Sequence, residues 1–153
     1  MLREPCLECT PASSACRVYH ARMAEHPNLV LLRRGMAAFA AHDLATLKEL
    51  FSEDIRWHHM GTSILSGDYS GLGEIFEHFA RRAALTGNTY EVVVLQAIAA
   101  DQFISVVSKV EAKRDDGKRY SDVICIVYRI VSGRCVEAWV HPAAPEAEAE
   151  FYG

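Results

Sequence analysis

The sequence predicts a single α+β domain in which helices near the start of the chain pack on one side of an antiparallel sheet. Apolar residues first recur at helical spacing, and the second half then changes to runs rich in threonine, tyrosine and valine. Short turns join these runs, as at Asp115-Asp116-Gly117-Lys118, which is typical of a hairpin. Helices segregated from a meander of strands indicate the α+β class rather than alternating βαβ units.

Three helices are expected before the meander. The first begins at His26-Pro27-Asn28, where proline suits a first helical position and Asn28 suits a cap, and it ends near His42. Asp43 is the expected cap of a short second helix. A third helix carries an apolar stripe from Leu72 to Ala83 and stops at Thr86-Gly87-Asn88.

A short strand and a long loop are expected between the second and third helices. Ile55, Trp57 and His59 alternate with Arg56 and His58, which indicates a strand with two different faces. A loop rich in glycine and serine follows over 61–71. Four further strands are expected at 89–98, 103–113, 119–131 and 134–141. A strongly curved sheet of this kind leaves a cavity between itself and the helices.

Length, charge and hydropathy exclude several function classes. The chain has 153 residues and a net charge of -4, so it lacks the basic footprint of a nucleic-acid-binding protein. No run approaches the roughly 18 apolar residues of a membrane span. Residues 1–25 lack an apolar signal core and are interpreted as an N-terminal extension. The domain then covers 26–142, with 143–153 as a C-terminal tail, in a protein expected to be cytoplasmic.

The cysteines predict neither a metal site nor a disulfide framework. Cys6 and Cys9 form half of a zinc or redox motif, with Cys16 nearby, but no second pair completes it. The total of five is odd, which favours reduced thiols in a cytosolic protein. No phosphate-binding loop or dinucleotide fingerprint occurs, so no metal and no cofactor are expected.

Several motifs in fixed order resemble the SnoaL-like, nuclear transport factor 2-like superfamily, which includes ketosteroid isomerases, scytalone dehydratase and limonene epoxide hydrolase. The resemblance covers residues 26–142. It implies a cone-shaped α+β barrel around one small-molecule pocket, but it implies no particular reaction. The motifs are His26-Pro27-Asn28, His42-Asp43-Leu44, 52–58, 65–71, Ser132-Gly133-Arg134 and Glu137-Ala138-Trp139.

The resemblance also implies where a site lies. The first strand of such proteins points alternate side chains into the cavity, which places Trp57 and His59 there. His59 looks like the position at which ketosteroid isomerases keep their carboxylate base. Ile126 stands where relatives often carry an acid or histidine. Lys109 and Glu111 resemble part of the epoxide-hydrolase set, but Val140 replaces its last aspartate, so that mechanism is not expected.

His59 and Asp122 are the candidate catalytic residues. A buried histidine titrates near neutral pH, and a carboxylate beside it makes an acid-base pair. The alternatives are a histidine satisfied by backbone groups, and an aspartate at the wet end of its strand. The candidates for the pocket wall or mouth, some of which could equally be ordinary core or interface, are Phe39, Trp57, Tyr69, Phe79, Tyr128, Trp139 and His141.

Two functions remain open at this point. One is an enzyme without a cofactor, an isomerase, cyclase, dehydratase or hydrolase acting on a small apolar polyketide-, terpenoid- or steroid-like compound. The other is a non-catalytic ligand-binding or dimerisation domain. A carboxylate meeting His59 inside the cavity would favour the enzyme. A homodimer through the open sheet face is expected, with Val106, Val110, Val123 and Val127 as its apolar residues.

Overall fold

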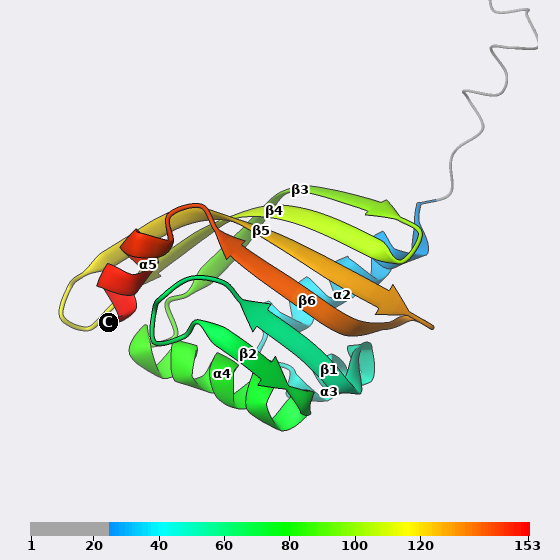
Figure 1. Ribbon diagram of the computed structural model, residues 1–153, viewed down its shortest axis with the longest axis horizontal. Helices are drawn as coiled ribbons and strands as arrows, with labels where there is room; N and C mark the ends of the chain where they lie inside the picture. The colour runs from blue at the N-terminus through cyan, green and yellow to red at the C-terminus, as the bar shows by residue number, and fades with distance from the viewer. Residues whose placement is uncertain (1–24) are drawn as a thin grey trace, which may run out of the picture.

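The computed structural model describes residues 25–153 and confirms the α+β class (Figure 1). The N-terminal extension, with Cys6, Cys9 and Cys16, lies outside these residues apart from its last position. The elements follow the expected order with two additions. They are α2 (Pro27–Ala40), α3 (Leu44–Leu50), β1 (Phe51–His59), β2 (Gly67–Ser70), α4 (Gly71–Leu85), β3 (Glu91–Ala100), β4 (Phe103–Lys113), β5 (Arg119–Val131), β6 (Arg134–Pro142) and α5 (Pro145–Tyr152).

The six strands form one sheet in the order β2-β1-β6-β5-β4-β3. Neighbouring strands are antiparallel except β1 and β6, which pair in parallel. The helices α2 and α4 contact opposite ends of this sheet, at β3 and β1 respectively, and the sheet bends over both (Figure 1). This bend makes the concave side on which the core lies.

Local chemistry explains where the helices begin and end. Asp43 caps α3 by accepting a hydrogen bond from the Thr46 amide at 3.0 Å, as expected. At α2 the cap is His26, whose ring nitrogen accepts from the Asn28 amide at 3.2 Å, so the prediction of Asn28 as the cap was wrong by two residues. The turn after α4 requires a left-handed residue, and Gly87 supplies it with φ +54°.

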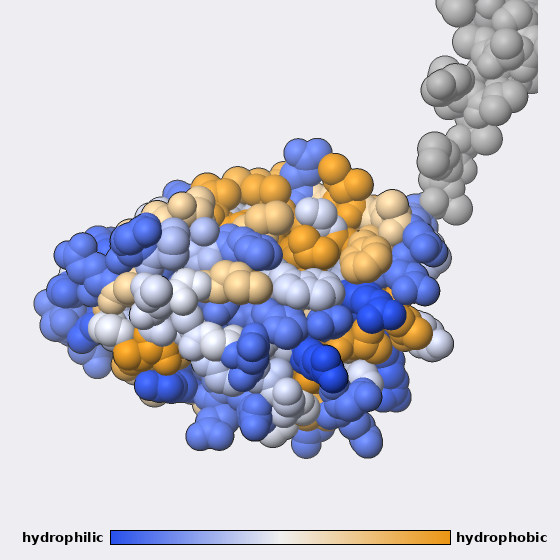
Figure 2. All heavy atoms as spheres, viewed as in Figure 1, coloured by the Kyte–Doolittle hydropathy of each residue, from blue (hydrophilic) through white to orange (hydrophobic). Residues whose placement is uncertain are grey.

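The alternation of buried and exposed residues along β4 defines the two faces of the sheet. Val106 and Val110 are buried on the concave side. They therefore cannot belong to the expected interface on the open face, whereas Val123 is 42% exposed there. Figure 2 shows apolar side chains gathered over β3 and β4. The large apolar residues exposed on these two strands include Val93, Leu95, Ile98, Phe103 and Val107.

Three elements differ from the sequence-based expectation. The strand β1 begins at Phe51, earlier than expected. Its first half was not recognised in the sequence because Ser52, Glu53 and Asp54 form a polar run without alternation. The edge strand β2 lies within the expected loop. Residues 143–153 are not a tail, since α5 buries Phe151 and Tyr152 against the domain. In the described part of the chain no helix is long and apolar enough to cross a membrane.

Candidate functional site

A cavity of about 80 Å³ lies between the helices and the concave face of the sheet. A wider groove of about 550 Å³ shares several of its wall residues and borders α2, α4 and the start of β3. The two spaces have in common Met36, Phe39, Leu47, Phe79, Arg82, Tyr90 and Val92. The groove therefore adjoins the cavity.

The wall of the cavity is apolar and largely aromatic. Phe39, Trp57, Phe79 and Tyr128 lie on it, as expected from the sequence. Phe79 meets both Phe39 and Trp57 edge to face, with ring centroids 5.3 Å apart in each case. Such contacts fix ring orientation in addition to burying area. Contact of these rings with a substrate stays a prediction.

Arg82 is the charged residue of the cavity wall, and sequence reasoning missed it. It is only 6% exposed, although it follows the exposed Arg81 near the end of α4 and reads as a surface residue. Its Nη2 atom lies 3.2 Å from His59 Nδ1 and 3.1 Å from His78 Nε2. Its guanidinium lies over the ring of Tyr90, 4.7 Å from the centroid. Within residues 25–153 its buried Nε atom has no hydrogen-bond partner.

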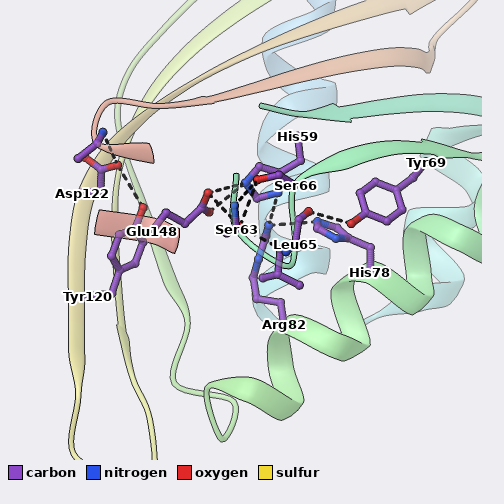
Figure 3. Close-up of polar contacts among 11 residues, drawn as sticks. His59, Ser63, Leu65, Ser66, Tyr69, His78, Arg82, Tyr120, Asp122 and Glu148 are labelled. Atoms are coloured by element: carbon purple, nitrogen blue, oxygen red, sulfur yellow. Dashed lines mark hydrogen bonds and ion pairs between the residues drawn. The ribbon is translucent and has the colours of Figure 1, made fainter. Parts of the chain in front are cut away.

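His59 does meet a carboxylate, but the carboxylate is Glu148 of α5 (Figure 3). His59 Nε2 lies 2.9 Å and 3.1 Å from the two Glu148 oxygens, and both side chains are buried. An arginine can only donate, so His59 Nδ1 accepts from Arg82 and its Nε2–H donates to Glu148. Neither His59 nor Glu148 lines the cavity, because Arg82 lies between the pair and the cavity.

His78 accepts the second Nη2 hydrogen of Arg82 at its Nε2 atom. Burial, reinforced by the Arg82 charge, lowers the pKa of His78 to about 2, so it is neutral and accepts at Nε2. Tyr69 does not line the cavity, contrary to expectation. Its ring centroid lies 4.3 Å from that of His78, and its hydroxyl donates to the Leu65 carbonyl at 2.8 Å. Tyr69 therefore supports the partner of Arg82.

Asp122 is not the partner of His59. Its carboxylate accepts from the Tyr120 hydroxyl at 3.1 Å and from the amides of Val123 at 2.7 Å and Ala144 at 3.1 Å. Ala144 precedes α5, so Asp122 ties the start of that helix to the sheet. Figure 3 shows Glu148 directed toward His59, while Asp122 is directed toward Tyr120. The expected pairing of His59 with Asp122 is thus replaced by one with Glu148.

Trp139 and His141 lie on the outer face of β6 rather than on the cavity wall. His141 is exposed, and Trp139 stacks on His58 with ring centroids 5.7 Å apart. Lys109 and Glu111 also lie on the outer face, where they form an ion pair of 2.8 Å. The sequence did not settle which face of β6 is inside, and its parallel pairing with β1 decides it.

His58 gives a testable pH effect on this outer face. Its ring forms hydrogen bonds with Asp68 at 2.6 Å and Glu137 at 3.0 Å. These bonds raise the pKa of His58 above its ordinary value near 6.5, and the bond to Asp68 contributes most. A raised folded-state pKa stabilises the fold below about 6.5, and this contribution is lost as pH rises through the raised value. Because the cluster is solvated, we expect His58→Gln to cost under about 1 kcal/mol in acid and nothing in alkali.

Urea unfolding at several pH values measures this difference. His141→Gln, an exposed histidine of the same face, is the matched control and is expected to follow the wild-type profile. An identical pH profile for wild type and His58→Gln would show that the two carboxylates do not act on His58.

The described residues contain no group of three or more histidine, cysteine, aspartate or glutamate side chains that suits a metal ion. Cys125 and Cys135 are free, and burial raises the pKa of the Cys135 thiol to about 12. Cys135 is therefore an unreactive wall residue of the cavity.

Comparisons with known proteins agree on one kind of domain. The profile of a family described as SnoaL-like domain matches residues 32–138. An uncharacterized protein of Mycobacterium tuberculosis is 29% identical over 129 residues, which is 82% of this chain and 98% of that protein. The structure of Bal32a, from a soil-derived mobile gene cassette, has a TM-score of 0.79 at 35% identity and covers 83% of this chain and 97% of its own.

Two more distant structures share the fold. One is IdmH of Streptomyces antibioticus, provisionally named a polyketide cyclase, with a TM-score of 0.67 at 16% identity, covering 80% of this chain and 98% of its own. The other is TerC, co-crystallized with polyporic acid, with a TM-score of 0.70 at 16% identity, covering 78% of this chain and 93% of its own.

Proposed function

This chain belongs to the SnoaL-like domain family, and on that premise we propose that it is a cofactor-independent enzyme acting on a small, largely apolar molecule bound in the cavity. The reaction is an isomerisation, cyclisation, dehydration or hydrolysis in which negative charge develops on a substrate oxygen. The observation that carries the proposal is Arg82, a buried cation whose Nε–H has no partner in the described chain and which lines an otherwise apolar cavity.

Arg82 is the residue that would contact the reacting part of the substrate. A donor fixed before the reaction stabilises charge on an oxygen without reorganising at the transition state. The surrounding wall of Trp57, Phe79 and Tyr128 excludes water, which strengthens this interaction. The same apolar wall positions the body of the substrate.

His59 acts through Arg82 in this proposal and is a positioning residue. Both of its ring nitrogens are engaged, one by Arg82 and one by Glu148. The chain of Glu148, His59 and Arg82 holds the guanidinium in one place and places a negative charge behind it. The general-base role expected from the sequence would require a free ring nitrogen in the cavity.

The distant structures favour a ring-containing substrate, because one is provisionally a polyketide cyclase and another binds polyporic acid. We further propose a cytoplasmic homodimer joined through the outer face of β3 and β4. The exposed side chains of Val93, Ile98, Phe103 and Val107 supply the apolar surface that such a contact buries.

One observation favours a non-catalytic binding protein as the second candidate. In the part of the chain that the structure describes, the inner cavity has no carboxylate and no imidazole on its wall. A base that takes a proton directly from carbon would have to reach the substrate. A non-catalytic binding protein needs only the apolar wall and the charged group of Arg82.

Native mass spectrometry of gently purified protein, followed by identification of any bound compound, tests the proposal. The compound is then incubated with wild type, Arg82→Met and the matched surface variant Arg81→Met, and its conversion is followed by NMR. We expect Arg82→Met to lower kcat about 10²–10³-fold, as loss of one such donor does, and Arg81→Met to leave it unchanged. A compound that binds but is never converted would favour the binding protein.

A further inference from the structure

The charge of Arg82 is incompletely matched by the protein. Its Nη2 hydrogens go to two neutral imidazoles, His59 and His78, and not to a carboxylate. The nearest acid in this chain of contacts is Glu148, on the far side of His59. Buried charges are ordinarily paired, and a buried donor without an acceptor costs free energy. The Nε–H of Arg82 is such a donor, and Arg82 lines the cavity.

We propose that the cavity selects acidic compounds and holds them as anions, with an enol, phenol or carboxylic oxygen on Arg82. This inference rests on the proposed function and narrows it to a substrate class. The ligand combines an apolar body, which fits the aromatic wall, with one ionisable oxygen at the guanidinium. A charge-assisted bond of this kind is roughly twice as strong as a neutral one.

The other titratable groups around Arg82 are compatible with an anion. His59 on β1 and His78 on α4 accept from Arg82, and His59 separates it from Glu148 on α5. Tyr90, under the guanidinium, has a pKa raised by burial and stays a neutral phenol. Tyr152 of α5 also stays neutral, because burial raises its pKa more than Arg82 lowers it, and its buried hydroxyl has no hydrogen-bond partner in the described chain. Two carboxylates act on this cluster, Glu148 behind His59 and Asp122 of β5 near Tyr90, and Arg81 adds a second positive charge near His78.

An ionised substrate also accounts for a cavity wall without a base. When an acidic enol binds, its O–H bond breaks, the electron pair stays on the oxygen beside Arg82, and the proton passes to water in the adjoining groove. The carbon of the resulting enolate is already nucleophilic. Reprotonation at carbon takes a proton back from that water, and ring closure joins the carbon to a carbonyl carbon of the same molecule, whose oxygen receives the π electrons and then the proton. Both steps need orientation rather than a protein base.

The test uses para-nitrophenol, whose anion has its own visible absorbance, and para-nitroanisole, its methyl ether, which cannot ionise. Absorbance titrations at several pH values give the affinity of the anion and of the neutral phenol separately. We expect wild type to bind the anion about tenfold tighter than the phenol or the ether. This preference corresponds to a pKa of the bound phenol about one unit below that of the free phenol.

Arg82→Met is expected to lose this preference while still binding para-nitroanisole, which shows that the cavity is intact. Arg82→Lys serves if the methionine variant does not fold, and is expected to retain part of the preference. Arg81→Met is the matched control and is expected to retain all of it. Equal binding of anion and ether by wild type would overturn this inference and leave the cavity proposal standing. Binding of neither compound would overturn both.

Discussion

Replacing Glu148 by alanine is expected to lower the free energy of unfolding by about 3 kcal/mol. The carboxylate accepts from the buried His59 at 2.9 Å and lies 3.4 Å from the Ser63 hydroxyl. Its removal leaves the His59 Nε2–H without an acceptor and the buried Arg82 without a compensating charge. Breaking a buried charge pair by removing one partner costs about 3–5 kcal/mol, and we take the low end because His59 separates the charges.

Urea unfolding measures this loss, with Glu150→Ala as the matched control. Glu150 lies in the same helix but is exposed, so its replacement is expected to change stability by less than about 0.5 kcal/mol. Glu148→Gln keeps an acceptor for His59, so its free energy of unfolding should lie between those of Glu148→Ala and Glu150→Ala. Equal stabilities of Glu148→Ala and Glu150→Ala would show that the buried contact with His59 contributes nothing.

Replacing Trp57 by alanine is expected to cost about 3–5 kcal/mol, because a large buried aromatic residue leaves a void that the fold fills only in part. Trp57 is 5% exposed and packs against Phe51, Phe79 and Tyr128. Since it lies on the wall between these rings, its loss should also abolish binding of an apolar ligand. Thermal unfolding and a ligand titration measure the two effects.

The second tryptophan of the chain is the control. Trp139 lies on the outer face against His58, so Trp139→Ala should cost no more than about 1.5 kcal/mol and leave ligand affinity unchanged. Its fluorescence should also be insensitive to ligand, so Trp139→Phe keeps the ligand-induced signal and Trp57→Phe loses it. A ligand response from Trp139 would place the binding site on the opposite face of the sheet.

The sequence was most informative where a short-range rule acts alone. Asp43 caps its helix through the amide three residues on, and Asp115-Asp116-Gly117-Lys118 turns the meander, because both effects need only neighbouring residues. The strand β2 was missed because it is short and exposed at the edge of the sheet. The helix α5 was missed because its fold depends on contacts of Phe151 and Tyr152 with distant residues.

The candidate site shows the same difference between features that local patterns predict and features that depend on distant contacts. Trp57 was expected on the wall from the family resemblance and Phe79 from the apolar stripe of its helix, and the structure places both there. Arg82 was missed because a pair of arginines near a helix end is ordinarily solvated, and burial is a tertiary property. Asp122 was chosen because it lies in an apolar strand, and Glu148 was not considered because residues 143–153 were interpreted as a tail. The available signal was the spacing of Glu148 from Phe151 and Tyr152. Residues three and four positions apart lie on one face of a helix, so the two aromatic side chains that face the domain direct Glu148 toward it as well.

The contact between β1 and α5 also has a kinetic side. His59 and Glu148 are 89 residues apart in the chain, and the parallel pairing of β1 with β6 joins segments that are similarly remote. Closing such long loops is slow, because their entropy is lost before any contact compensates for it. During synthesis, His59 and Arg82 leave the ribosome long before Glu148. A nascent chain therefore has no complete site until residue 148 has emerged, and ligand binding reports that the domain has closed.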